Sequence, residues 1–560
     1  MSAPLKSPSE LRARYNPAFG LITGPVYGVG YHTRLPGGSE AHPHRENAVH
    51  AFALLASGAP ADQAFGRELL ARVLAAQDTD PVSPWYGLWS WFAEEPLPSM
   101  NPADWNWADF IGCSLIEILN HAADRLTPEL AVATRTALGH AAWSIFRRNV
   151  TLDYTNIAIL GSAVVLGAGQ LLAEPRLTAY GGQRLHALRA RIEKHGIAEY
   201  NSPNYYMGDI GDLERILHLP LDPSIHADAS ALLRLFWQNI AHHFHAPTGQ
   251  WGGPHSRAYT DWLSPVSAGF LETRLGFPLP GRRHPPSASG GQDDPYVIPA
   301  SAVPCPADLL TRFQTPPATA YEHREVWTRD DAGRPKAAGS TWFTPRLAFG
   351  SINQELAWKQ CQPITAYWRG DDGAFGRLRV RVLLNGTDFC SARIHAAQRG
   401  PLLLGAIDFV PNGGTTHIHF DKPPGGVFTV RDLRVRIEVE GAAAQATQVS
   451  PTEWTLAAAG DVFTVGFGPA WFDGVPVTAH EPGRADESAW IDAILHTGAE
   501  RDFHPVRAGL SALTFGIVHP GSGRGKLDSL DLREETSGYC AHAVVTDADP
   551  LTLRWTKLSA

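Results

Sequence analysis

The sequence predicts a two-domain α+β protein in which an incomplete α/α toroid is followed by an antiparallel β-sandwich. From about residue 46 to about residue 277 the apolar residues recur with the period of an α-helix, and beyond residue 317 they alternate with a period of two. The chain has 560 residues, which exceeds one ordinary hydrophobic core. We therefore expect a helical domain at 1–280, a linker at 281–317 and a β-sandwich at 318–560.

The helical region consists of many predicted helices joined by short loops, a pattern that favours antiparallel neighbours. A closed arrangement of such helices gives an α/α toroid, and aromatic-rich loops such as residues 85–91 are expected to gather at one of its ends. A plain helical bundle is the alternative, whereas the lack of a fixed-period repeat disfavours a solenoid. The predicted helices are 47–56, 62–76, 107–122, 128–146, 156–172, 184–195 and 229–245.

The second half of the chain follows a stretch rich in proline, glycine and serine, which is typical of a linker. Numerous short strand-like runs then alternate with turn residues, and this pattern predicts an antiparallel sandwich. The predicted strands are 340–347, 365–368, 377–384, 402–409, 415–420, 434–439, 452–457, 462–466, 511–518 and 551–555.

Composition narrows the classes of partner. The net charge of -9 argues against a general nucleic-acid-binding surface, and 17 tryptophans are compatible with stacking on sugars as well as with core packing. No stretch approaches the roughly eighteen apolar residues needed to cross a bilayer, so we expect no membrane partner. Residues 1–16 lack the apolar core of a secretory signal, which predicts a cytoplasmic protein. A trimmed signal peptide would instead make it periplasmic or secreted.

The five cysteines are scattered and contain no CxxC pair, so they predict neither a disulfide framework nor a cysteine zinc site. The oligomeric state stays open.

The most informative segment is Glu199-Tyr200-Asn201-Ser202-Pro203-Asn204-Tyr205-Tyr206. It gathers a carboxylate, two amides and three phenols around one proline. Amides hydrogen-bond a carboxylate without ionising, and a phenol can accept and return a proton. These are the two tasks of a uronate lyase. The alternative is a helix-capping turn, with Ser202 or Asn204 as the N-cap and the tyrosines packed in a core.

The domain order and this segment resemble the heparinase II/III and alginate lyase superfamily of polysaccharide lyases. That family carries a glutamate shortly before a Ser-Pro-x-Tyr element, so Glu199 matches the glutamate and Tyr205 its catalytic tyrosine. Upstream, Asp153-Tyr154-Thr155-Asn156 opens a predicted helix, and Asn156 matches by position the family's carboxylate-neutralising asparagine. The common Asn-Asn-His triplet is absent, because Ile157 stands where its histidine would be.

A histidine must therefore come from elsewhere, and the segment from Gly252 to Tyr259 is the best source. Its Gly-Pro turn exposes side chains that could engage an acidic sugar, although a turn with an arginine salt bridge is the alternative. We predict as catalytic residues Asn156, Tyr205, His255 and Arg257, and as substrate-binding residues Asn201, Tyr206, Tyr259, Trp89, Glu199 and His44.

The resemblance implies β-elimination, in which the proton at C5 of a uronate is removed and the oxygen at C4 departs. Asn156, helped by Arg257 or His255, would stabilise the enolate-like charge, and Tyr205 would take the proton directly or through His255. The scheme requires no cofactor. In the segment 415–421, which alternates like a strand, His417, His419 and Asp421 share one face. They are candidates for an active-site histidine or a structural metal ion, with a polar strand face as the alternative.

The expected partner is an acidic oligosaccharide or polysaccharide of the glucuronate type, and the rhamnosyl-glucuronate lyases are one such group of enzymes. The sequence leaves the polymer and the endo or exo mode of action open. The competing enzyme class is an α/α-toroid glycoside hydrolase with paired carboxylates. Its candidate residues are Glu94, Glu95, Asp109, Glu199, Asp209 and Asp212. A non-enzymatic carbohydrate-binding protein is the third class.

Overall fold

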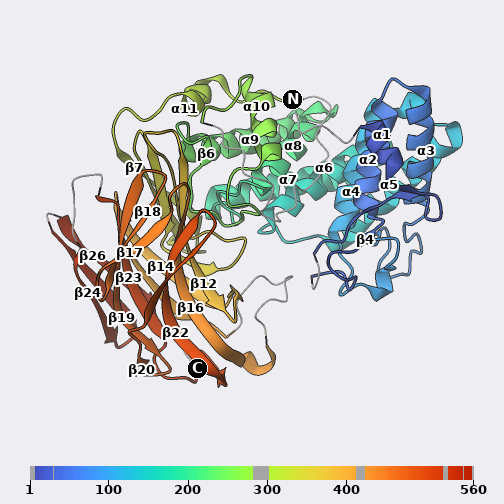
Figure 1. Cartoon of the computed structure of the whole chain (residues 1–560). Helices are drawn as coiled ribbons and strands as arrows, with labels where there is room; N and C mark the ends of the chain where they lie inside the picture. The colour runs from blue at the N-terminus through green and yellow to red at the C-terminus, as the bar shows by residue number, and fades with distance from the viewer. Residues whose placement is uncertain are drawn as a thin grey trace.

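The structure, a computed structural model, describes residues 7–28, 31–281, 302–411, 423–520, 527–546 and 548–557. Helices fill the first part of the chain and antiparallel sheets the second, which confirms the predicted fold class (Figure 1). In this view the sandwich lies at one side, and the helical domain arches away from it. None of the described helices is long and apolar enough to span a bilayer.

The helical domain is a double layer of helices. Its helices are α1 (Pro8–Ala13), α2 (His44–Ala56), α3 (Pro60–Leu74), α4 (Asn106–His121), α5 (Pro128–Arg148), α6 (Thr155–Leu171), α7 (Pro175–His195), α8 (Tyr205–His218), α9 (Pro223–His243) and α10 (Pro265–Leu275). The even-numbered helices α2, α4, α6 and α8 contact one another in order, and so do α3, α5, α7 and α9. Helices α4, α6 and α8 are buried on most sides, whereas α3 and α7 bury one face. This pairing makes an incomplete α/α toroid.

Glycines allow the inner helices to approach closely. A Cβ on Gly112 of α4 would lie 2.8 Å from Val164 of α6, and one on Gly167 would lie 2.6 Å from Ile116. Three charged side chains buried in this layer form an ion-paired group, since the Arg215 guanidinium donates to Glu117 Oε1 at 2.7 Å and also to Asp212. Short strands complete the domain: β1 (Tyr15–Asn16), β2 (Leu21–Ile22), β3 (Gly24–Pro25), β4 (Glu40–Ala41), β5 (Phe244–His245) and β6 (Gln250–Trp251).

Two large antiparallel sheets face each other in the second domain. One contains β7 (Tyr321–Arg329), β8 (Pro335–Phe343), β9 (Leu347–Ile352), β11 (Ile364–Arg369), β12 (Phe375–Leu384), β13 (Thr387–Asp388), β16 (Phe428–Glu440), β21 (His480–Ala485) and β22 (Ser488–Phe503). The other contains β10 (Gln354–Ala357), β14 (Ala392–Arg399), β15 (Leu402–Phe409), β17 (Gln445–Ser450), β18 (Glu453–Ala458), β19 (Asp461–Phe472), β20 (Val475–Pro476) and β23 (Ala512–Val518). Apolar side chains from both sheets, including Phe349, Ile437 and Phe515, form the core between them.

A third sheet, of β24 (Leu527–Glu535), β25 (Gly538–Val545) and β26 (Ala548–Thr556), covers the outer face of β15. Leu402 and Leu404 point outward from β15 and pack with Tyr539 and Trp555 of this sheet. Because alternate residues of a strand point to opposite faces, β15 is buried on both sides, as its apolar sequence requires.

Several predicted elements differ from the observed ones. Helix α7 begins at Pro175 rather than at residue 184, and α8 and α10 were not predicted. The predicted strand at 340–347 is two strands, β8 and β9. The predicted linker contains a 3-10 turn (Ala307–Leu309) and α11 (Leu310–Gln314), which pack on α9, while residues 282–301 lie outside the described part. The predicted strand at 415–420 also lies outside the described residues.

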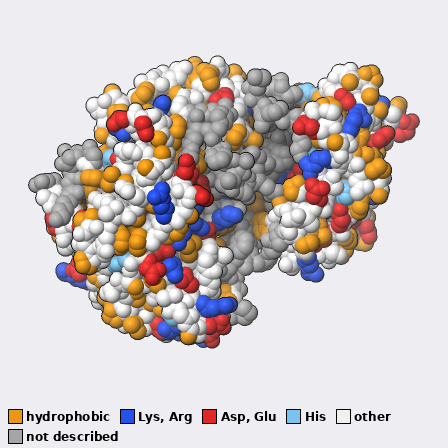
Figure 2. Space-filling view, viewed as in Figure 1, with side chains coloured by type: hydrophobic (Ala, Val, Ile, Leu, Met, Phe, Trp, Pro, Cys, Tyr) orange, Lys and Arg blue, Asp and Glu red, His pale blue; other side chains and the backbone are white. Residues whose placement is uncertain are grey.

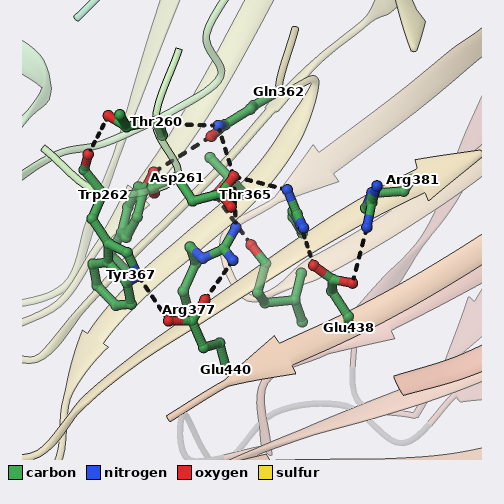
Figure 3. Close-up of polar contacts among 12 residues, drawn as sticks. Thr260, Asp261, Trp262, Gln362, Thr365, Tyr367, Arg377, Arg381, Glu438 and Glu440 are labelled. Carbon is green, nitrogen blue, oxygen red and sulfur yellow. Dashed lines mark hydrogen bonds and ion pairs between the residues drawn. The ribbon is translucent and has the colours of Figure 1, made fainter. Parts of the chain in front are cut away.

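The two domains are joined by a polar network (Figure 3). Asp261, in the loop before α10, accepts a hydrogen bond from Arg379 Nη1 at 2.8 Å and lies 3.1 Å from Arg377 Nη1. The neighbouring Trp262 donates its indole N–H to Glu440 of β16 at 3.0 Å. These contacts hold the loop at residues 255–262 against β12 and β16, so both domains position its side chains.

Candidate active site between the two domains

Asn201 ties the segment at residues 199–206 to the segment at residues 251–259. Its φ of 44° lies in the left-handed region, which asparagine tolerates better than most residues. Its amide donates to the carbonyls of Gly252 at 2.9 Å and Pro254 at 2.7 Å, and its Oδ1 accepts the Trp251 indole N–H at 2.6 Å. The side chain is fully buried. All of its polar atoms bind protein, which does not fit the predicted contact with substrate.

Two further links bring Tyr205 and Tyr259 together. The Ser202 hydroxyl donates to the Arg257 carbonyl at 2.9 Å and accepts the Tyr205 N–H at 3.0 Å. Asn204 Oδ1 accepts the Tyr259 N–H at 2.7 Å. Asn204 is the N-cap residue of α8, so the segment starts a helix, in agreement with the alternative interpretation of the sequence. The polar groups of the segment also position the residues of a candidate site.

The hydroxyls of these two tyrosines form a direct pair. Tyr259 Oη donates to Tyr205 Oη at 3.0 Å, and the rings meet edge to face with centroids 5.8 Å apart. Tyr205 is 7% exposed at the first position of α8. The pair therefore places one phenol as a hydrogen-bond donor to the oxygen of the other.

Arg257 lies beside this pair and is held by the sandwich. Its guanidinium stacks on the Trp358 ring at 4.5 Å, and its Nη1 donates to Gln360 Oε1 at 3.4 Å. Burial acts against its charge, but the proximity of Tyr205 and Glu199 raises the pKa of Arg257. Sequence reasoning did not find Trp358 or Gln360, because they belong to the other domain.

Glu199 and Asn156 form the next part of the site. Glu199 Oε2 accepts the Asn156 backbone N–H at 3.0 Å, in the first turn of α6. Burial raises the pKa of Glu199 to about 7, although this hydrogen bond and Arg257 act in the opposite direction. The side-chain oxygen of Asn156 is buried and has no hydrogen-bond partner among the described residues. An amide oxygen accepts hydrogen bonds, so it is the amide nitrogen of Asn156 that could donate to a substrate carboxylate.

Two tyrosines that the sequence did not single out also belong to this site. Burial raises the pKa of both Tyr31 and Tyr154, and both interact electrostatically with Tyr205 and Asp104. Tyr154 lies within the motif that indicated Asn156, and its hydroxyl accepts the Asn106 side-chain N–H at 3.2 Å. Tyr31 packs against the small cluster of Trp358 and Cys390, for which no sequence signal existed.

His255 does not fit the predicted exchange of a proton with substrate. It is 1% exposed, and its Nδ1 lies 2.8 Å from the Asn201 carbonyl. Its backbone pairs with Gln362 in both directions, at 3.0 and 2.9 Å. Burial lowers the pKa of His255 to about 4. These contacts give His255 a structural role at the domain junction.

Three predicted substrate-binding residues are also in the core. Trp89 is fully buried and donates its indole N–H to the Val73 carbonyl at 2.8 Å. Tyr206 is fully buried, and its hydroxyl accepts the Asn201 N–H at 2.9 Å. His44 is 3% exposed, with burial lowering its pKa to about 4. Aromatic and histidine side chains pack well in a core, and sequence spacing did not distinguish that role from stacking on a sugar.

The weak metal candidates His417, His419 and Asp421 lie outside the described residues, so they remain predictions.

Comparisons with known proteins find one domain family and several solved enzymes that are similar to this chain. A family model described as a domain of unknown function (DUF8769) matches residues 28–267. No curated protein matches the sequence.

Among solved structures, a heparinase III has a TM-score of 0.41 at 11% identity, covering 92% of this chain and 82% of that one. The Streptomyces coelicolor A3 chondroitin AC lyase in complex with chondroitin sulphate has a TM-score of 0.43 at 11% identity, covering 96% and 87%. A mutant of the heparan sulfate lyase HepC from Pedobacter heparinus has a TM-score of 0.32 at 11% identity, covering 99% and 90%.

Proposed function

We propose that this chain is a polysaccharide or oligosaccharide lyase that cleaves the glycosidic bond at C4 of a uronic acid by β-elimination. The observation that supports this most strongly is the 3.0 Å hydrogen bond from Tyr259 to Tyr205 beside the buried Arg257 guanidinium. An elimination needs a base, an acid and a cluster that stabilises an anion, and these side chains supply all three kinds of group.

Tyr205 is the proposed base and acid. A donated hydrogen bond from Tyr259 and a nearby arginine cation both stabilise an anionic phenolate oxygen. As a phenolate, Tyr205 removes the proton from C5, the bond between C4 and the glycosidic oxygen breaks, and a C4=C5 double bond forms. The Tyr205 phenol then returns the proton to the departing oxygen. General acid-base catalysis of this kind is worth about 10²- to 10⁴-fold in rate.

Arg257 and Asn156 are the proposed partners of the substrate carboxylate. Removal of the C5 proton pushes negative charge onto that carboxylate, and fixed donors that meet this charge lower the barrier. The Arg257 guanidinium is held in place by Trp358, while the Glu199 carboxylate binds the backbone N–H of Asn156. Glu199 is therefore a positioning residue, which sets the orientation of the first turn of α6.

The competing hydrolase is favoured by one observation. The partly exposed Glu199 and the buried Asp209 interact electrostatically, and desolvation raises the pKa of both carboxyls. A hydrolase needs one ionised and one protonated carboxyl in contact with the sugar. Asp209 is only 2% exposed, which limits such contact. The other candidates bind protein groups: Glu94 binds His42, Glu95 binds Thr33, Asp109 lies near Arg148, and Asp212 binds Arg215. We therefore favour elimination.

We propose a sparsely sulfated substrate, and the surroundings of two other arginines support this choice. Arg215 is buried in ion pairs, and Arg45 is buried with its guanidinium 3.7 Å from the Phe110 ring centroid. Acidic and basic side chains are interspersed on the visible face of the molecule (Figure 2). A glucuronate chain end, including a rhamnosyl-glucuronate end, suits one buried arginine better than a heavily sulfated polymer does.

The test is ultraviolet absorbance of the C4=C5 double bond, which is conjugated to the carboxylate. Purified protein is incubated with fragments of heparin, hyaluronan, chondroitin and alginate and with rhamnosyl-glucuronate oligosaccharides. We expect absorbance to rise with wild type but not with Tyr205→Phe. Tyr180→Phe is the control and should behave as wild type does, because the hydroxyl that it removes hydrogen-bonds Asn149 on the outer surface of the toroid. New reducing ends without absorbance would replace elimination with hydrolysis.

A further inference from the structure

Three potential metal ligands converge where the two domains meet, away from the tyrosine pair. His242 lies in the last turn of α9, and His323 and Glu325 lie on β7, the first strand of the sandwich. Their donor atoms all lie within 4.8 Å of one another. Among the residues that the structure describes, no other group of three histidine, cysteine or acidic side chains meets this criterion.

Strand geometry explains the placement of two of these ligands. His323 and Glu325 are two residues apart on β7, so their side chains point to the same face. His323 Nε2 lies 3.3 Å from Glu325 Oε2. The centroid of the His323 ring lies 5.0 Å from that of His242. The side chains of His323 and Glu325 are about one quarter exposed, which leaves them room to adjust.

These separations can be compared with a tetrahedral zinc site. Zinc–nitrogen and zinc–oxygen bonds of about 2.0 to 2.2 Å place neighbouring ligand atoms about 3.3 to 3.6 Å apart. The His323–Glu325 pair already has this spacing, and since all the donor atoms lie within 4.8 Å, no pair needs to close by more than about 1.5 Å, which side-chain rotation can supply. We propose that His242, His323 and Glu325 bind a zinc ion that joins the helical domain to the sandwich.

His243 adds a polar group beside this site. Its Nδ1 lies 3.0 Å from the Asn239 carbonyl, which fixes the proton on Nδ1 and leaves a lone pair on Nε2. That Nε2 lies 4.0 Å from Glu325 Oε2, close enough to complete the coordination after a small movement. Arg312 of α11 is the nearby cation that acts on His242, and its charge opposes a bound ion. Two imidazoles and a carboxylate suit zinc better than calcium or magnesium, which prefer oxygen ligands.

The site would act on the candidate active site through packing. The His243 ring lies 4.8 Å from the Trp327 ring, which stacks on Tyr200 at 5.4 Å. Tyr200 stands between Glu199 and Asn201 in the segment that carries Tyr205, one member of the tyrosine pair. A zinc ion would therefore hold β7 behind this segment, in a structural rather than a catalytic role.

The experiment measures zinc directly and does not depend on the lyase activity. The full chain is stripped with a chelator and dialysed against zinc chloride, and bound metal is measured by elemental analysis. We expect about one zinc per chain for wild type, as for a single closed structural site. We expect zinc to bind at least about 100-fold more weakly to His323→Ala and to Glu325→Gln. Loss of a residue that only hydrogen-bonds a metal ligand already weakens metal binding by about 10- to 100-fold, and these variants lose a ligand itself.

His186→Ala is the matched control. His186 also lies near a carboxylate, with its Nδ1 3.1 Å from Asp228 Oδ2, but the two residues have no third potential metal ligand beside them among the described residues. This variant should bind zinc as wild type does. Circular dichroism establishes that each variant is folded, and zinc should raise the melting temperature of wild type and His186→Ala but not of Glu325→Gln. Absence of stoichiometric zinc in wild type, or equal binding by both ligand variants, would overturn the proposal and leave the proposed elimination untouched.

Discussion

Replacement of Glu199 by glutamine tests how burial has set the charge of the candidate site. Glu199 accepts the Asn156 N–H at the start of α6, and burial raises its pKa from 4.5 to about 7. A glutamine at this position keeps the shape and an oxygen acceptor but cannot ionise. Any pH-dependent difference between the two proteins therefore reports the ionisation of this one carboxyl.

The sign and size of the effect follow from the shift in pKa. The folded state holds the Glu199 proton more tightly than the unfolded chain does, because the folded pKa is the higher one. The resulting stability is fully present below about pH 4.5 and is lost as the pH rises to about 7. A rise of about 2.5 in pKa corresponds to about 3 kcal/mol. Relative to Glu199→Gln, wild type should thus lose about 2 to 3 kcal/mol between about pH 5 and about pH 8.

The assay is urea unfolding of both proteins across this pH range, followed by tryptophan fluorescence and by helical circular dichroism. Glu174→Gln is the control, because Glu174 also accepts a backbone N–H at the start of a helix, α7, but hydrogen bonds from Arg176 lower its pKa to about 2. Its stability difference from wild type should be constant above about pH 5. A difference between wild type and Glu199→Gln that is equally constant would refute the claim that burial governs this carboxyl.

Further predictions concern the tyrosine pair, the arginine and the core. Tyr205→Phe should lower the rate of elimination by about 10²- to 10⁴-fold without changing thermal stability. Tyr259→Phe should move the acidic limb of the pH–rate profile to higher pH, since the Tyr205 phenolate loses its hydrogen-bond donor. Arg257→Lys should reduce kcat/KM by about 10²-fold, because a lysine lacks the planar guanidinium that stacks on the Trp358 ring and donates two hydrogen bonds to a carboxylate. Wild-type kinetics in this variant would contradict the proposed role. Trp89→Ala should lower the free energy of unfolding by about 3 to 5 kcal/mol, because the Trp89 side chain is fully buried. A smaller loss of stability together with a raised KM would instead support the predicted contact between Trp89 and substrate.

The helices and strands were predictable to a large extent because their signals are local. The bounds of β15 match the predicted strand at 402–409, and helix α6 differs from its predicted range by one residue at each end. The range of helix α8 is not predicted, because the residue types of this segment favour a site, and a helix that begins here is only the alternative interpretation, with Ser202 or Asn204 as its N-cap. The segment is both, since α8 begins at Tyr205 and presents its first hydroxyl to Tyr259.

The sequence by itself determined the fold class and drew attention to Glu199, Tyr205 and Arg257, because hydrophobic period and residue type are properties of neighbours in the chain. Only the tertiary structure decided which side chains are available. Burial of His255 and the approach of Trp358 to Arg257 each depend on contacts between the helical domain and the sandwich. His242 and His323 meet for the same reason. Burial, pKa and ligand geometry come from packing between residues distant in sequence, and local patterns carry little information about them.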